Sequence, residues 1–168
     1  MITGNDRHQP VMKEDHREAL EELFDYIYKG DAEAKRLSFM LFNIAQGWDD
    51  LVDGDNVSKK DINSLFIDSI FTVQQSPYWA PMGLSHHVLN VWLRWRDSDT
   101  IETGIFTEDD LNKCYMLRAG LYDLFVIIAY YLHGSDWACE IGPLVRRSYG
   151  EKLNVYKEEI CQIQQEDC

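Results

Sequence analysis

Apolar residues recur along most of the chain at the three- and four-residue spacing of an amphipathic helix. No stretch alternates with the period of two that a half-buried strand requires. We therefore predict an all-α protein, a helical bundle without a sheet. The predicted helices cover about residues 13–29, 31–53, 58–73, 85–95, 108–133 and 151–166.

Capping residues and helix breakers set the predicted helix ends. Side chains that favour the N-cap position precede four of the helices, namely Asp31, Ser58, Ser85 and Thr107. Two of them are followed three residues later by an aspartate, as in a capping box that uses Asp in place of Glu. Glycines, prolines and a polar run predict interruptions at residues 76–83, 97–106, 134 and 142–143.

Two apolar patterns predict what the bundle buries. The third helix has a stripe that should face the core, made of Ile62, Leu65, Phe66, Ile70 and Val73. The run Leu124–Leu132 is apolar on all sides, so its helix should lie in the centre of the bundle. Since a membrane span needs about 20 apolar residues and this run is shorter, we predict no membrane span.

Length and composition fit one globular domain. The chain has 168 residues, of which 45% are hydrophobic, and this is enough for a full core. We expect a loose leader at residues 1–12 and a single all-α domain over residues 13–168. The polar start lacks the apolar stretch of a secretory signal, and the four cysteines form no close pair. We therefore expect a cytoplasmic protein.

The charge balance is strongly acidic. The chain has 16 lysines and arginines against 29 aspartates and glutamates, which gives a net charge of −13. Such a surface repels a phosphate backbone over most of its area. We therefore expect no broad nucleic-acid binding.

Aspartates crowd the end of the second predicted helix. Asp49 and Asp53 are four residues apart and Asp50 and Asp53 are three apart, which places their carboxylates on one helix face. They repel one another and lie at the negative end of the helix dipole. A divalent cation would offset both penalties, and Mg²⁺ prefers carboxylate oxygens. We predict an Mg²⁺ site at Asp49, Asp50 and Asp53, and a solvated acidic helix end is the alternative.

A calcium loop of the EF-hand type does not fit this segment. Such a loop needs oxygen ligands at positions 1, 3 and 5, Gly at 6 and Glu at 12. A loop that begins at Asp50 has Val52 at position 3. A loop that begins at Asp49 has Leu51 there. Neither register supplies the ligands, so we do not expect an EF-hand.

Residues 34–56 run from an apolar helix into Asp49-Asp-Leu-Val-Asp-Gly54 and then an asparagine-containing turn. This pattern resembles the squalene/phytoene synthase branch of the class I isoprenoid synthases. Residues 110–121 also look like a family helix that contains a tyrosine and an Ala-Gly pair and lines the central cavity. The resemblance implies a bundle of isoprenoid-synthase type in which the aspartates hold Mg²⁺ and, through it, a prenyl diphosphate.

The chain departs from the family in two ways. The second aspartate motif of the family, Asp-x-x-x-Asp preceded by Asn and Arg, has no close counterpart, and the nearest candidates are Asp123, Asp136 and Glu140. The chain also has about half the usual family length. We therefore predict a truncated bundle that binds a diphosphate without appreciable turnover. The residues predicted to bind the diphosphate are Arg118, Arg146 and Arg147.

A second function stays open. The chain is also similar to short phage-encoded proteins of unknown function, with an aspartate motif near the start and a loop like Ser76-Pro-Tyr-Trp79. A non-catalytic interaction protein that keeps the fold is therefore the alternative to diphosphate binding. Because a half-length bundle cannot cover Leu124–Leu132 on every side, we also predict a homodimer through apolar parts of the later helices.

Overall fold

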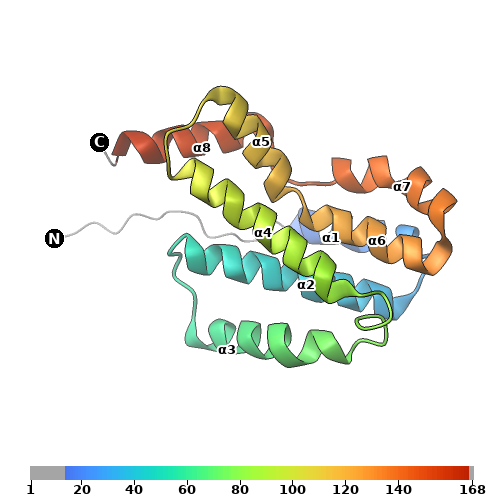
Figure 1. Ribbon diagram of the computed structural model, residues 1–168. Coiled ribbons are helices and arrows are strands. Elements are labelled where there is room, and N and C mark those ends of the chain that lie inside the picture. The colour runs from blue at the N-terminus through green and yellow to red at the C-terminus, as the bar shows by residue number, and fades with distance from the viewer. Residues whose placement is uncertain (1–13, 167–168) are drawn as a thin grey trace. The chain divides into compact units, whose positions relative to one another are not determined.

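The structure is a computed structural model that describes residues 14–166 and the side chains of residues 16–162 (Figure 1). These residues form helices and no strand, which confirms the all-α prediction. The isoprenoid-synthase type and the truncation stay predictions, and the predicted leader at residues 1–12 lies outside the described residues. The α-helices are α1 (Glu14–Ile27), α2 (Ala32–Val52), α3 (Lys59–Ile67), α4 (Leu84–Glu102), α5 (Glu108–Arg118), α6 (Leu121–His133), α7 (Ser135–Arg147) and α8 (Leu153–Glu166). A π-helix, η1 (Asp68–Thr72), and a 3₁₀ turn, η2 (Val73–Gln75), extend α3.

The contacts between residues group the chain into two compact units. The first unit ends at Pro81 and contains α1, α2, α3, η1 and η2. The second begins at Met82 and contains α4 to α8. The single domain expected over residues 13–168 stays a prediction.

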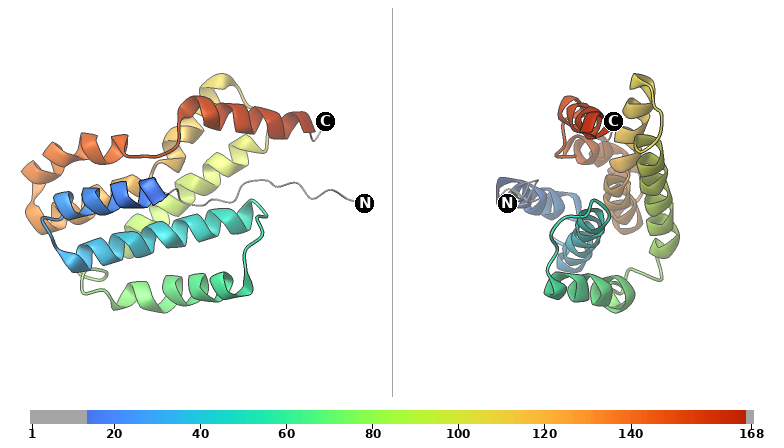
Figure 2. Two further views of the ribbon diagram at one scale, coloured as in Figure 1. Left: turned by 180° about the vertical axis from the view of Figure 1, so that it is seen from behind. Right: turned by 90° about the vertical axis from the view of Figure 1, so that its left-hand side faces the viewer.

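In the first unit, α2 contacts α1 on one side and α3 on the other (Figure 2). The helix α1 buries one apolar face, which includes Leu20, Phe24 and Ile27. Directly after α1, the buried Tyr28 forms a hydrogen bond of 2.6 Å with the hydroxyl of Ser38 on α2. The bond satisfies two polar groups that are removed from water, so it fixes how α1 lies on α2.

Asp31 is the N-cap of α2 and also forms a hydrogen bond with Tyr78, which lies in the loop after η2. As predicted, its carboxylate caps the helix, because Oδ1 accepts the backbone N–H groups of Glu33 and Ala34 at 3.0 and 2.9 Å. Its other oxygen accepts the hydroxyl of Tyr78 at 2.6 Å. This bond raises the pKa of Tyr78 to about 12, because the neutral phenol is the form that donates to the carboxylate.

In the second unit, α4 contacts α5 and α6, α6 also contacts α7, and α5 contacts α8. The pair α6–α7 buries Phe125, Ile128, Ile141 and Val145. A smaller cluster of Leu111, Cys114 and Tyr156 holds α8 on α5. The predicted capping box at Thr107 is confirmed, since Thr107 and Asp110 exchange both bonds.

The helix α4 differs from its prediction at both ends. Gly83, with φ of 60°, takes the N-cap position that was expected for Ser85. The helix continues to Glu102, so the linker predicted at residues 97–106 is mostly wrong. Its polar residues bond back to the helix, since the hydroxyls of Ser98 and Thr100 donate to carbonyls three and four residues earlier. A run of such residues looks like a linker in the sequence although it is helical.

The single long helix predicted over residues 108–133 is wrong, because the chain turns between α5 and α6 at Ala119 and Gly120. A side chain at Gly120 would lie 3.1 Å from the guanidinium carbon of Arg94, so the turn brings the backbone close to α4. By length and composition alone, residues 108–133 are the one described stretch apolar enough to cross a membrane. A core helix passes the same test, so the absence of a span stays a prediction.

One further expectation for the second unit is wrong. The break predicted at Gly142–Pro143 does not occur, because Pro143 lies inside α7. Packing outweighs the lost N–H bond there, since Ala138, Ile141 and Val145 are buried along the same helix. Within the run Leu124–Leu132, four residues are buried, three are half-buried, and Tyr130 and Tyr131 are about half-exposed, so the central position of this helix stays a prediction.

Candidate functional site

The predicted metal ligands lie at the carboxyl end of α2. Asp49 and Asp50 are in its last turn, and Asp53 is the C-cap, with its N–H bonded to the carbonyl of Asp49 at 2.9 Å. Gly54 follows with φ of 77°, and the N–H of Asp55 bonds to the carbonyl of Asp50 at 2.9 Å. This helix stop folds the chain back, so it brings Asp55 close to Asp50.

The electrostatic consequence appears at Asp50. Partial burial raises the pKa of this carboxyl, and the negative charges of Asp55 and Asp49 raise it further. Among the aspartates of the cluster, Asp53 is exposed, whereas Asp49, Asp50 and Asp55 are half-buried. The structure therefore brings Asp50 together with Asp49 and Asp55, and Asp53 lies on the outer side of the turn.

The aspartates at the end of α2 do not form a complete set of metal ligands. Among the side chains described, those of residues 16–162, no three His, Cys, Asp or Glu side chains are placed to hold one metal ion. The three predicted ligands therefore do not form a complete set, although Mg²⁺ is commonly held by one or two carboxylates with water and phosphate oxygens completing its shell. The Mg²⁺ site at Asp49, Asp50 and Asp53 stays a prediction, and no chemical step is derived through the ion.

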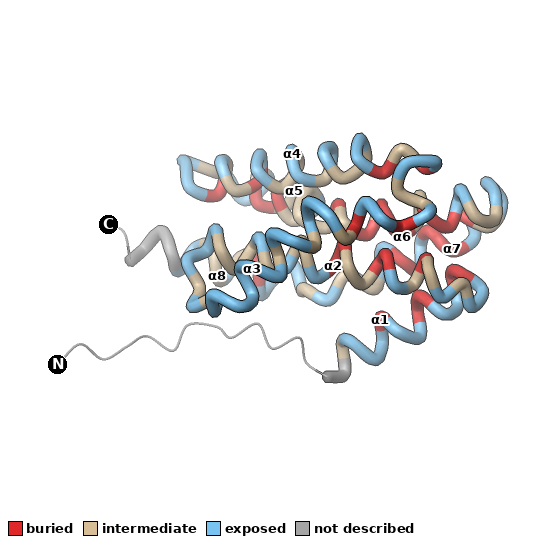
Figure 3. The backbone as a smooth tube through the Cα atoms, turned by 90° about the horizontal axis from the view of Figure 1, so that it is seen from below, coloured by how far each residue is buried: buried red, intermediate tan, exposed pale blue. Residues whose placement is uncertain are grey.

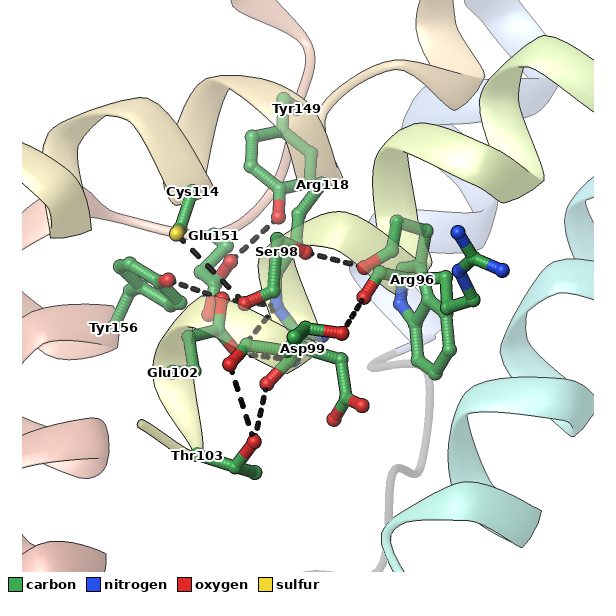
Figure 4. A network of polar contacts seen from close by, with 12 residues as sticks. Arg96, Ser98, Asp99, Glu102, Thr103, Cys114, Arg118, Tyr149, Glu151 and Tyr156 are labelled. Atoms are coloured by element: carbon green, nitrogen blue, oxygen red, sulfur yellow. Dashed lines mark hydrogen bonds and ion pairs between the residues drawn. The ribbon is translucent and has the colours of Figure 1, made fainter. Parts of the chain in front are cut away.

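The first predicted diphosphate ligand, Arg118, forms an ion pair inside the second unit (Figure 4). Its Nε and Nη2 donate to the carboxylate of Glu102 at 2.9 and 2.6 Å, and its guanidinium carbon lies 5.6 Å from the ring centre of Trp95. The side chains of Arg118 and Glu102 are 15% and 4% exposed. The hydroxyl of Tyr156 donates to the same carboxylate, so this polar network joins α4, α5 and α8.

The second predicted ligand, Arg146, is also paired. Its Nε donates to Asp123 at 2.9 Å, and Arg94 donates to the other oxygen of that carboxylate at 2.9 Å. Asp123 was one of the three nearest candidates for a second aspartate motif, and its carboxylate pairs with both of these arginines instead. Arg147 is exposed in the last turn of α7. The predicted aspartates belong to the first unit and the predicted arginines to the second.

A surface that sequence reasoning missed lies on α3 and η1. The sequence predicted a buried stripe here, yet neither α3 nor η1 contains a buried residue, and of the stripe only Val73 is buried. The helix contacts α2 through Leu65, whose Cδ1 would be 3.3 Å from a side chain at Gly47. The apolar side chains that remain exposed are Ile62, Phe66, Ile67, Ile70 and Phe71, which we call the α3 surface. In Figure 3 the backbone of α3 is coloured mostly as exposed.

One signal in the sequence could have identified the α3 surface. The apolar residues come in adjacent pairs, Phe66–Ile67 and Ile70–Phe71, and adjacent residues point about 100° apart on a helix. The apolar residues therefore cover more of the circumference of this helix than the side that contacts α2. The π-helix also lies at this place, with the N–H of Val73 bonded to the carbonyl of Asp68, and π-bulges occur frequently at functional sites.

Comparisons with known proteins do not extend this picture. No family model, no curated protein and no solved structure matches the chain. The resemblances to isoprenoid synthases and to phage proteins therefore stay predictions.

Proposed function

We propose that this protein is a non-catalytic interaction protein that binds another protein through the α3 surface. The observation that carries the proposal is the exposure of five large apolar side chains on one helix. Phe66 and Phe71 are 59% and 56% exposed, although each could bury about 150–250 Å² of surface. Contiguous apolar patches of a few hundred Å² typically mark interaction sites.

The polar groups of the second unit support the non-catalytic part of the proposal. Glu102, Arg118, Asp123 and Arg146 are four of the charged groups that sequence reasoning or burial would nominate for chemistry. Each is satisfied by the ion pairs described above. A ligand would have to break an ion pair to reach them, and an ion-paired group that loses its partner is costly to keep buried.

The experiment is a selection of random peptides displayed on phage against the immobilised protein. The matched variants are Phe66→Ser/Phe71→Ser, which removes the two rings, and Leu89→Ser, which removes an exposed leucine of α4. We expect enriched peptides to bind the double variant at least about tenfold more weakly, a loss of about 1.4 kcal/mol, and to bind the leucine variant unchanged. If no peptide is enriched, or if all three proteins bind alike, the proposal is wrong.

A second candidate function is Mg²⁺-dependent binding of a diphosphate at the end of α2. The observation that favours it is the crowding of Asp50 by Asp49 and Asp55, which a cation would relieve. Thermal unfolding with Mg²⁺, with and without a prenyl diphosphate, tests it. A ligand present at about 100 times its dissociation constant should stabilise the fold by about 2.7 kcal/mol. The stabilisation should disappear in Asp50→Asn, and no stabilisation of the parent would exclude this function.

A further inference from the structure

The helical segment formed by α3, η1 and η2 changes phase at its π-helix. In a continuous α-helix the backbone N–H of Val73 would bond to the carbonyl of Ser69, four residues earlier. In the structure it bonds to the carbonyl of Asp68, five residues earlier. This turn therefore contains one residue more than an α-helical turn, and one residue corresponds to a rotation of about 100°. The residues before the π-helix are thus rotated by about 100° relative to Val73.

This rotation accounts for the exposure of the α3 surface. The sequence places Ile62, Phe66 and Ile70 at four-residue intervals. Three residues further, Val73 continues the same helix face and is only 2% exposed. In an uninterrupted α-helix the whole row would share the buried side of Val73, yet its first three members are 40%, 59% and 41% exposed. The π-helix therefore turns an apolar row outward and leaves Asp68 half-buried.

The helix α2 is placed to cover this row in an uninterrupted register, because it contacts α3, η1 and η2. Leu65 now lies opposite Gly47, where its Cδ1 would be 3.3 Å from an added Cβ. If the residues before the π-helix turned by one position, Phe66 would take the place of Leu65. Since glycine has no side chain, this place has room for a ring. Ile44 and Leu51, three residues before and four after Gly47, are half-buried and give this face of α2 an apolar character.

We infer that residues 59–75 are a register switch, a segment that presents or withdraws the α3 surface by changing its helical phase. The arrangement in the structure is the π register, and the uninterrupted helix is the α register. In the α register Ile62, Phe66 and Ile70 pack on α2, and Asp68 turns to solvent. The inference rests on the proposed function, since it assigns a regulation to the same surface. A bound partner covers the exposed row and so favours the π register.

The switch needs only a small movement. A shift by one residue displaces the rotating part by about 1.5 Å along the helix axis. Residues 53–58 connect α2 to α3 outside any helix and can absorb this displacement. The N-cap bonds between Ser58 and Asp61 lie within the moving part, so they move with it unbroken. Register shifts of packed helices are among the known modes of conformational change.

Disulfide trapping in the full chain tests the switch. Gly47→Cys/Leu65→Cys places two thiols opposite each other in the π register, and Gly47→Cys/Phe66→Cys does so only in the α register. Gly47→Cys/Ile67→Cys is the matched control, because position 67 faces away from α2 in both registers. Each variant is treated with a thiol oxidant, and the bond is located by mass spectrometry after proteolysis, which separates it from bonds of the native cysteines.

We expect position 47 to bond with positions 65 and 66 at least about tenfold faster than with position 67, because only the first two bring the Cβ atoms close. Deletion of Ser69 removes the extra residue, so it should keep the bond to position 65 and abolish the bond to position 66. Ser69→Leu adds an apolar side chain to the row that packs on α2 in the α register. It should favour the bond to position 66 and weaken the binding of display-selected peptides at least about tenfold.

A bond to position 66 that forms no faster than the bond to position 67 would overturn the switch, and peptide binding by the parent would leave the proposed function intact. If the bonds form as expected and display selection yields no peptide, the proposed function fails while the two registers remain. If no cysteine pair bonds, alkylation rates of single cysteines decide. Phe66→Cys should react faster than Asp68→Cys in the Ser69 deletion and more slowly in Ser69→Leu, and an unchanged ratio would overturn the inference.

Discussion

The ion pair between Glu102 and Arg118 provides the sharpest test of the fold. Replacing Glu102 with Gln keeps the shape of the side chain and removes its charge, which leaves the guanidinium of Arg118 without its carboxylate. Removing one partner of a buried ion pair commonly costs 3–5 kcal/mol. Arg118 is still 15% exposed and lies over Trp95, so we expect about 3 kcal/mol, the lower end of that range.

Urea unfolding followed by tryptophan fluorescence and far-UV circular dichroism measures this loss. With a slope of about 2 kcal/mol per molar urea, the midpoint should fall by about 1.5 M. If the two units unfold in separate transitions, only the transition of residues 82–168 should move. The matched control is Lys113→Ala, which breaks an ion pair with Asp109 in which the side chains are 61% and 75% exposed. That variant should lose less than about 1 kcal/mol.

The double variant Glu102→Leu/Arg118→Met separates a buried charge from a general packing defect. Because it removes both charges and keeps apolar volume, it should recover most of the stability that Glu102→Gln loses. The reasoning is refuted if Glu102→Gln shifts the midpoint no more than Lys113→Ala does. A double variant less stable than the single one would show that the network contributes more through its geometry than through its charge balance.

Three shorter predictions follow from the other contacts. Asp31→Ala should lower the free energy of unfolding by about 1–2 kcal/mol in thermal denaturation, since an N-cap is lost; an unchanged value would mean that this cap is dispensable. Because the pKa of Asp50 is raised above 3.8, its contribution to folding is fully present below pH 3.8 and is lost as the pH rises through the raised value. Asp50→Asn should therefore gain stability relative to the parent between pH 3.8 and neutrality, and a constant difference across thermal melts in this range would contradict it. Light scattering at micromolar concentration should show that the parent is a homodimer. Leu144→Lys, which changes an exposed position of α7, should convert it to a monomer, and a parent that is already monomeric would contradict this prediction.

The parts of the fold that could be predicted are those that depend on residues close in sequence. The N-cap at Asp31, the capping box at Thr107 and the helix end after Val52 all follow from side chains within a few residues of the feature. The acidic helix end was likewise visible, since the crowding of Asp50 by its neighbours needs no tertiary contact. Such local features can be predicted from the sequence because the same few residues form them in any tertiary context.

The parts that could not be predicted depend on pairs of residues far apart in the sequence. Arg118 looked available for a ligand because nothing near it in the sequence shows that Glu102, sixteen residues earlier, turns back against it. The polar run at residues 97–106 looked like a linker for a related reason. Glu102 lies within this run and is among the most buried charged residues described, and its partners Arg118 on α5 and Tyr156 on α8 are far from it in the sequence. A charge that seems free in a sequence is therefore weak evidence for a ligand site until its tertiary partners are known.

The α3 surface shows a different limit of sequence reasoning. Periodicity correctly identified Ile62, Phe66 and Ile70 as one row of a helix, and it cannot tell whether another element of the same chain covers that row. The same pattern is produced by a core helix and by a helix that binds a partner, because both bury apolar side chains in the functional state. The difference lies in what supplies the cover. For the α3 surface no described residue of the chain supplies it, since its five side chains are between 40% and 59% exposed.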